Sequence, residues 1–312
     1  MKKITFTVLV QIICATGFSA NPRWQMIDEV HIPAHADLNV RWEATNKFPR
    51  KVWIYQLLPN DFSPKIISNV MTLCSFTDND KTKENTNGVT FKSSNGSRIL
   101  SFSFSSGGIN YEVSEPRYNP IHLAEGVPKM SEMPKLTKGF LKKVGIKLSE
   151  IQKDTNGNTH FSFWEPLTEF FLKGGGSITN IAFRAVVFRR SVNGADVVGD
   201  AGYAELHFGE HGNISKIDLS WPNLKRYKSF PTLKPQTIIQ LLREGKSLQE
   251  PIPTNVGYID WLSVKSITIK KAEPCYFAGD TSWLYPFLWL DTIVDTGHGA
   301  VEVGIDCPIF DE

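Results

Sequence analysis

Cysteine is scarce in this chain, and the spacing of its few cysteines excludes one kind of metal site. The 312 residues include four cysteines, at positions 14, 74, 275 and 307, and none of them belongs to a C-x-x-C pair. A zinc ribbon needs such pairs, so the sequence excludes that class of protein. The chain also lacks a G-x-S-x-G motif, which excludes the nucleophile elbow of the α/β-hydrolases.

Excess charge of either sign is small. The chain has 34 basic and 32 acidic residues, and residues 1–20 contain two of the lysines and none of the acids. Proteins that bind nucleic acids carry a basic surplus or a basic stripe, and the sequence shows neither. The densest lysine stretch, residues 135–147, is interpreted as the solvated face of a helix. The sequence therefore predicts no nucleic-acid partner.

Long hydrophobic runs are confined to the N-terminus. Lys2 and Lys3 precede an apolar stretch from Ile4 to Phe18, and small residues follow up to Ala20. This layout is typical of a cleavable secretory signal, so we expect residues 1–20 to be a signal peptide. The mature protein is then secreted, or lies in the periplasm or cell envelope. No later segment reaches eighteen apolar residues, so we expect no transmembrane segment after cleavage.

Export permits disulfide bonds, and an odd number of cysteines remains once Cys14 leaves with the signal. We expect a bridge between Cys275 and Cys307, because both flank predicted strands near the C-terminus. Three separate buried thiols are the alternative. Cys74 lies in an apolar helical run and is predicted to be a buried thiol.

The periodicity of apolar residues predicts three helices, each of which begins at a proline. They cover residues 64–76, 134–148 and 235–243. Alternating apolar residues predict strands at 89–91, 98–104, 109–113, 161–164, 181–188, 203–208, 214–221, 263–270, 276–277 and 300–305. Asn95-Gly96, Gly107-Gly108 and Asn193-Gly194 are predicted to be tight hairpin turns.

The order of a helix followed by a meander occurs twice, which indicates an internal repeat. We therefore expect an α+β fold with two helix-plus-antiparallel-meander units and a strand-rich C-terminal extension. The expected domains are a signal peptide at 1–20, an N-terminal extended segment at 21–58, a first unit at 59–125, a second unit at 126–250 and the extension at 251–312.

The second meander resembles a known family. Residues 187–199 (VFRRSVNGADVVG) and 203–214 (YAELHFGEHGNI) are similar to the R-x-V-[DN]-G-x-x-V-x-G and L-x-V-x-x-x-x-G-x-I pattern of PepSY-like domains. Such domains include those of YycH/YycI-type envelope regulators. Residues 100–102 and 108–111 of the first unit match the pattern more loosely. The resemblance implies two PepSY-like units in an exported protein that binds or restrains a partner, and it transfers no catalytic residue. The N-terminus departs from YycH/YycI-type regulators, because it resembles a cleavable signal rather than an anchor.

One motif offers a metal-dependent alternative. His207, Glu210 and His211 spell H-x-x-E-H, the inverted zinc-peptidase motif, in which both histidines bind one zinc ion and the glutamate activates water. That chemistry needs the two histidines on one face of a helix. Gly209 and Gly212 and the strand-like flanking runs indicate a turn instead, so a solvated turn is the favoured interpretation.

An aromatic segment near the C-terminus offers another alternative. Trp283, Tyr285 and Trp289 lie within seven residues and could form a platform for a carbohydrate or another surface. Packing inside a sheet is the favoured interpretation of this segment. The sequence assigns no catalytic residue and no cofactor. We expect an exported, non-enzymatic binding or regulatory protein that acts on a protein partner, with a zinc hydrolase and a carbohydrate-binding module as alternatives.

Overall fold

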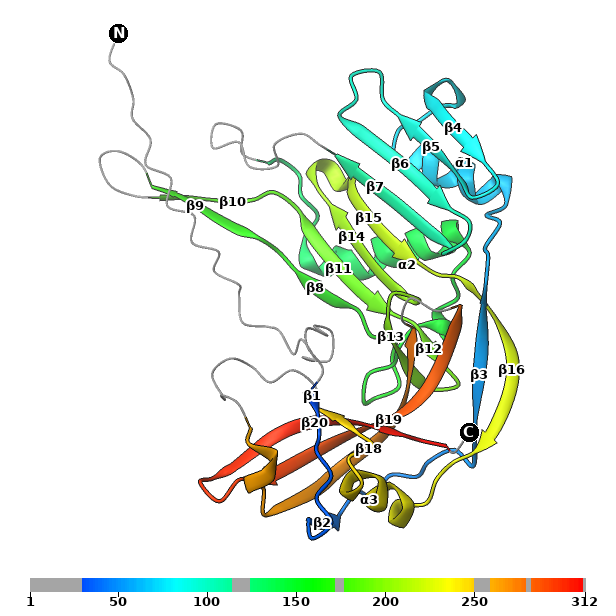
Figure 1. Cartoon of the computed structure of the whole chain (residues 1–312). Helices are drawn as coiled ribbons and strands as arrows, with labels where there is room; N and C mark the ends of the chain where they lie inside the picture. Colours follow the sequence, from blue (N-terminus) through cyan, green and yellow to red (C-terminus); the bar gives the residue numbers. More distant parts are fainter. Residues whose placement is uncertain (1–29, 114–123, 172–176, 250–258, 279–281, 311–312) are drawn as a thin grey trace. The chain divides into compact units, whose positions relative to one another are not determined.

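The computed structural model describes residues 30–113, 124–171, 177–249, 259–278 and 282–310 (Figure 1). The predicted signal peptide lies outside these ranges. The chain divides into two compact units. The first holds the described residues of Pro59–Arg190 and Gly202–Asn223, and the second holds those of Asn21–Leu58, Ser191–Ala201 and Leu224–Glu312. Within the described ranges, no helix is long and apolar enough to cross a bilayer.

The first unit is built on one eight-stranded antiparallel sheet (Figure 1). In spatial order its strands are β4 (Lys81–Asn85), β5 (Gly88–Lys92), β6 (Arg98–Ser103), β7 (Gly108–Val113), β15 (Ile214–Ser220), β14 (Tyr203–Phe208), β11 (Arg184–Arg189) and β8 (Ser162–Trp164). A separate hairpin consists of β9 (Leu167–Phe171) and β10 (Ser177–Ile181). Neither edge strand of this sheet offers a good template for pairing with a strand of another chain, because β4 is fully exposed and charged and β8 is only three residues long.

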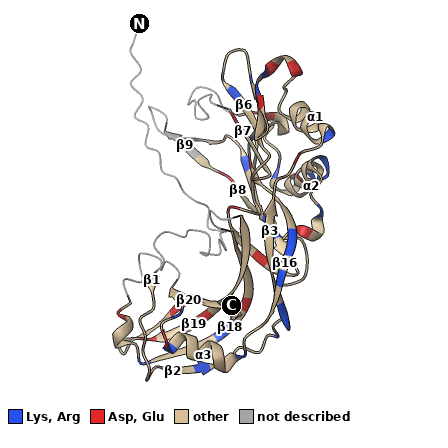
Figure 2. Ribbon diagram, turned by 45° about the vertical axis from the view of Figure 1, so that its right-hand side comes forward, with Lys and Arg blue, Asp and Glu red and all other residues tan. Residues whose placement is uncertain are grey.

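Two helices, α1 (Pro64–Leu73) and α2 (Met133–Val144), cover one face of this sheet (Figure 2). The hydroxyl of Ser63 caps α1 by accepting a hydrogen bond from the Ile66 backbone N–H at 3.4 Å. Gly145 ends α2 in the left-handed region, with φ of 79°. The buried faces of the helices and alternate residues of the strands form one core, so the helices that the sequence predicts here are confirmed.

The second unit is built on a ten-stranded sheet. Its strands are β1 (Val30–His31), β2 (Asn39–Trp42), β3 (Lys51–Leu58), β12 (Ser191–Val192), β13 (Ala195–Gly199), β16 (Asn223–Pro231), β17 (Leu248–Gln249), β18 (Ser266–Ala278), β19 (Trp283–Asp295) and β20 (Ala300–Pro308). Most neighbours are antiparallel, but β18 pairs in parallel with both β13 and β2. The helix α3 (Pro235–Arg243) packs its apolar face into the core of this sheet through Ile238 and Leu242.

Short single-turn helices connect the strands. They are η2 (Asp78–Asp80), η3 (Met130–Glu132), η4 (Leu148–Glu150), η5 (Glu210–Gly212) and η6 (Trp261–Ser263).

The expected fold class, α+β with two helix-plus-meander units and a C-terminal extension, is wrong. The chain is mostly β, with two large sheets. The physical reason is the pairing of β7 with β15, whose registers run from Ser220 opposite Gly108 to Lys216 opposite Glu112. This pairing joins the two meanders edge to edge, so they share one sheet and one core. The C-terminal strands are not an extension, because β18, β19 and β20 are central strands of the larger sheet.

The cysteines do not form the predicted bridge. Cys275 lies on β18 and Cys307 on β20, which flank β19 from opposite sides, and no disulfide joins them. Phe287 and Leu288 of the intervening strand lie opposite Cys275 and Cys307, respectively. Cys74 is buried as predicted, and burial raises the pKa of its thiol to about 12.

Candidate functional site

Two rows of side chains run across the strands on the face of the eight-stranded sheet that α1 and α2 leave uncovered. Side chains of a strand alternate between the two faces, so residues opposite one another share a face. The first row consists of Ser101, Asn110, Asp218 and Glu205, and the second of Ile99, Glu112, Lys216 and His207. We call these the polar rows. Their neighbours along β14, Ala204, Leu206 and Phe208, point into the core beneath the helices.

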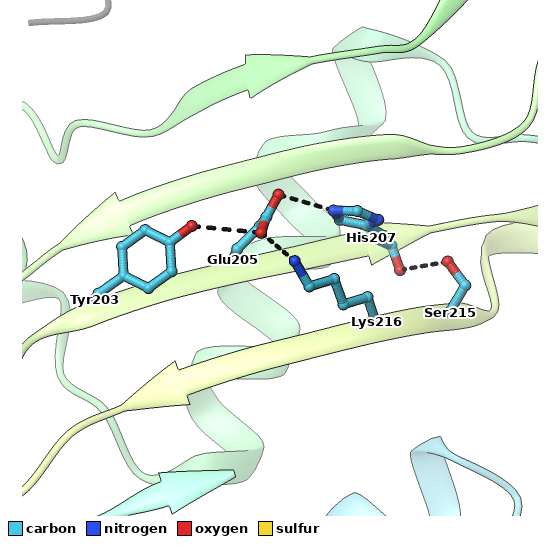
Figure 3. A network of polar contacts seen from close by, with 5 residues as sticks. All are labelled: Tyr203, Glu205, His207, Ser215 and Lys216. Atoms are coloured by element: carbon cyan, nitrogen blue, oxygen red, sulfur yellow. Dashed lines mark hydrogen bonds and ion pairs between the residues drawn. The ribbon is translucent and has the colours of Figure 1, made fainter. Parts of the chain in front are cut away.

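A carboxylate lies at the centre of the polar contacts in these rows (Figure 3). One oxygen of Glu205 accepts a hydrogen bond from Lys216 Nζ at 2.5 Å and another from the Tyr203 hydroxyl at 3.4 Å. The other oxygen lies 2.9 Å from His207 Nε2. Because an ionised carboxylate only accepts, Nε2 of His207 must carry the proton of this bond.

These contacts hold Glu205 in its charged form. Burial alone would raise the pKa of Glu205, but the hydrogen bonds and charges of His207 and Lys216 outweigh it and lower the pKa to about 2. A general acid or base works best with a pKa near the operating pH. Glu205 is therefore suited to a fixed negative charge and not to proton transfer at neutral pH.

The imidazole of His207 is enclosed by aromatic rings. It stacks on Phe183 with ring centroids 4.1 Å apart and planes 9° from parallel. Trp164 approaches it edge-on, with centroids 5.5 Å apart. As a result only 3% of His207 is exposed, although it lies on the face without helices.

The H-x-x-E-H residues do not form a zinc-peptidase site. His207 lies on β14, while His211 lies in η5 with φ of 54°, in the left-handed region. Glu210 Oε1 accepts a hydrogen bond from the Glu125 backbone N–H at 3.2 Å. The motif is thus split between a strand and a turn and has no common helical face. Among the described residues, no group of three or more His, Cys, Asp or Glu is placed to hold a metal ion.

The hydroxyl of Tyr203 belongs to the same network and stays protonated. Burial raises its pKa, and the negative charges of Glu205 and Asp218 raise it further. The Arg189 guanidinium lies over the Tyr203 ring, 5.0 Å from its centroid. Tyr203 therefore donates its hydrogen bond to Glu205 across the whole physiological pH range.

Of the three residues considered for an aromatic platform, Trp289 is buried, Trp283 is half-buried and Tyr285 is exposed. Trp283, Tyr285 and Trp289 share one face of β19, because odd-numbered residues of the strand point the same way. Trp289 is only 6% exposed, and Trp283 lies against Tyr227 with centroids 4.7 Å apart. Tyr285, at 38% exposed, is the one member of the three that presents a large surface to solvent.

The sequence interpretation missed most of the polar rows. Asn110 and Glu112 on β7 and Lys216 and Asp218 on β15 were part of the predicted strands but not of any predicted site. Alternation within each strand places these four residues on the polar face. What the sequence could not supply is the pairing of β7 with β15, which brings them together.

The chain was compared with known proteins. No family model matches it, and no curated protein matches it. Among solved structures, it is similar to a crystal structure of an uncharacterized protein from Eubacterium rectale ATCC 33656. The two are 10% identical, the match covers 92% of this chain and 93% of that chain, and the TM-score is 0.44. A likeness of this degree carries no argument about fold or function.

Proposed function

We propose that the protein is an exported, non-enzymatic binding protein, and that it binds a protein partner through the polar rows of the eight-stranded sheet. The observation that carries the proposal is a fixed charge next to exposed polar groups: Glu205, 9% exposed and held by Lys216, His207 and Tyr203, lies in the same row as the half-buried Asp218 and the exposed Asn110, on a face that has no helix over it. Polar groups that are already held in place lose little conformational freedom when a partner binds.

The charges on this face favour a basic partner segment. Between β7 and β14 the polar rows carry three carboxylates, Glu112, Asp218 and Glu205, and one ammonium, Lys216. Asn110 and Glu112 are exposed; the Asn110 amide can donate and accept hydrogen bonds, and the Glu112 carboxylate can accept them. A partner that places Lys or Arg side chains over Glu112 and Asp218 would match the face in charge and form charge-assisted hydrogen bonds.

The experiment that tests this proposal is charge reversal on the polar face. The variant Glu112→Lys/Asp218→Lys should lose capture of its partner from the native envelope or medium, with binding about tenfold weaker. A matched control changes exposed charges on the helix side, where Lys138→Glu/Lys142→Glu should leave capture within about twofold of the unmodified protein. Equal loss in both variants, or no loss in the first, would contradict the proposal. Sequencing the N-terminus of the mature protein tests export separately.

A further inference from the structure

The second unit carries a ribbon of two paired strands, β3 and β16, with an unusual set of charges. Neither strand contains an acidic residue: β3 reads KVWIYQLL and β16 reads NLKRYKSFP. Five basic side chains are exposed on or beside the ribbon: Arg50, Lys51, Lys225, Arg226 and Lys228. Figure 2 shows the run of Lys and Arg along β16. We call these five residues the basic ribbon.

The cations of the basic ribbon are not neutralised within the described part of the chain. The ion pairs found there involve other residues, so no described carboxylate lies within 4.0 Å of any of the five basic groups. The chain as a whole is nearly balanced in charge. A local run of five unpaired cations on such a chain is therefore a distinct positive surface.

Aromatic rings hold two of these cations in position. The Arg226 guanidinium lies over Trp53, 5.1 Å from the ring centroid, and Lys228 Nζ lies 4.5 Å from the centroid of Phe230. Tyr227, between them in sequence, is 64% exposed. Cations restrained in this way lose less side-chain freedom on binding than free lysines do.

We propose that the basic ribbon binds a linear anionic polysaccharide. The nine residues of β16 extend over about 30 Å, the length of several sugar units, with Arg226 and Lys228 on one side of the strand and Lys225 on the other. Carboxylate or sulfate groups on successive sugars would pair with these cations. The choice of an extracellular polymer rests on the export included in the proposed function, while the site itself is separate from the polar rows.

The contacts of the aromatic rings argue against two other polyanionic ligands, a single-stranded nucleic acid and an anionic bilayer. Single-stranded nucleic acids need open aromatic faces on which bases stack, but Trp53 is occupied by Arg226, and Tyr227 packs against Trp283 at 4.7 Å. An anionic bilayer is bound most firmly when apolar side chains enter it. Leu224 and Phe230 of β16 instead pack against cores of the second unit.

The test measures binding of the purified protein to four probes. They are heparin oligosaccharides, polygalacturonate, a twenty-residue oligothymidylate and vesicles that contain phosphatidylglycerol. The variant Lys225→Gln/Arg226→Gln/Lys228→Gln removes three cations from the ribbon. The control Lys135→Gln/Lys138→Gln/Lys142→Gln removes three exposed lysines from α2, so both variants have the same net charge.

The proposal expects at least one of the two polysaccharides to bind, with affinity that falls as salt rises. The ribbon variant should bind it about tenfold more weakly, and the control should stay within about twofold. If the ribbon variant does not fold, Lys225→Gln/Lys228→Gln, which keeps Arg226 on Trp53, should bind about threefold more weakly. The proposal is overturned if neither polysaccharide binds, if both variants lose binding equally, or if only the oligonucleotide or the vesicles bind. Because these probes contain no protein partner, failure here leaves the proposal for the polar rows standing.

Discussion

His207 lies flat on Phe183, with ring centroids 4.1 Å apart and planes 9° from parallel. This stack fixes the plane of the imidazole and directs Nε2 at Glu205, 2.9 Å away. The histidine that gives the H-x-x-E-H motif its first letter therefore serves a buried ion network. Phe183 lies just before β11 and His207 lies on β14, so the stack joins two neighbouring strands at the end of the second polar row.

Phe183→Ala should lower the free energy of unfolding by about 3 kcal/mol, because Phe183 is 4% exposed and its removal leaves a cavity against His207 and Trp164. Phe183→Leu keeps much of the volume and should cost less than half as much. Denaturant unfolding of the two variants measures this. An equal loss of unfolding free energy in the two variants would contradict the prediction that the cost comes from a cavity beside His207 and Trp164.

The pKa of Glu205 predicts how stability depends on pH. Its folded value of about 2 lies below the value of about 4.3 expected for an unfolded glutamate. The stabilisation is thus complete above the unfolded pKa and is lost as the pH falls toward 2. We expect the free energy of unfolding of the unmodified protein to fall between pH 5 and pH 2. The free energy of unfolding of the Glu205→Gln variant should fall less steeply over the same range. Parallel curves for the two proteins would contradict the ionised network.

Two glycines with positive φ differ in the space available for a side chain, so together they test how closely the backbone approaches Gly107. Gly107 has φ of 58°, and a Cβ there would lie 2.6 Å from the Trp221 carbonyl oxygen. Gly157 has φ of 80°, but a Cβ there would meet nothing within 4 Å. Gly157→Ala should cost about 1 kcal/mol from the left-handed backbone alone. Gly107→Ala should cost about 3 kcal/mol, because the backbone must also shift. Thermal unfolding of both variants gives the difference, and equal costs would contradict the close approach at Gly107.

Thiol titration tests the arrangement of the cysteines. Burial raises the pKa of both Cys74 and Cys307 to about 12, so these thiols should not react with a disulfide reagent at pH 8 in the folded protein. After denaturation without a reductant, the chain lacking residues 1–20 should release three thiols. A count of one would mean that Cys275 and Cys307 are bridged after all.

Local structure was predictable where short-range chemistry determines it. The helix at residues 235–243 has the predicted limits, and the helix that begins at Pro64 has the predicted start. Asn95-Gly96 lies in the turn that joins β5 to β6, Gly107 ends the turn that joins β6 to β7, and Gly96 and Gly107 both have positive φ. Proline, serine caps and glycine turns act within a few residues, so their effects can be inferred from the sequence.

Long-range pairing was not predictable from these signals. The repeat of helix and meander suggested separate units, but the exposed edges of β7 and β15 pair with each other across about a hundred residues of chain. Residues 283–289 were interpreted as packing inside a sheet, but β19 was not among the predicted strands, because Pro286 interrupts its apolar alternation. Pro286 nevertheless lies opposite Tyr276 in the sheet. The polar rows depend on the first of these pairings, so the candidate site could not be assembled from single strands.

The most direct test of the central claim is site-specific photo-crosslinking, because it reports which face of the first unit meets a partner. A photoreactive residue at Asn110, on β7 in the polar rows, is compared with one at Lys142, on the exposed side of α2. In the native envelope or medium, the probe at Asn110 should form one discrete protein adduct that Glu112→Lys/Asp218→Lys abolishes, while the probe at Lys142 should form none. An adduct at Lys142 alone, or the same adducts from both positions, would contradict binding through the polar rows.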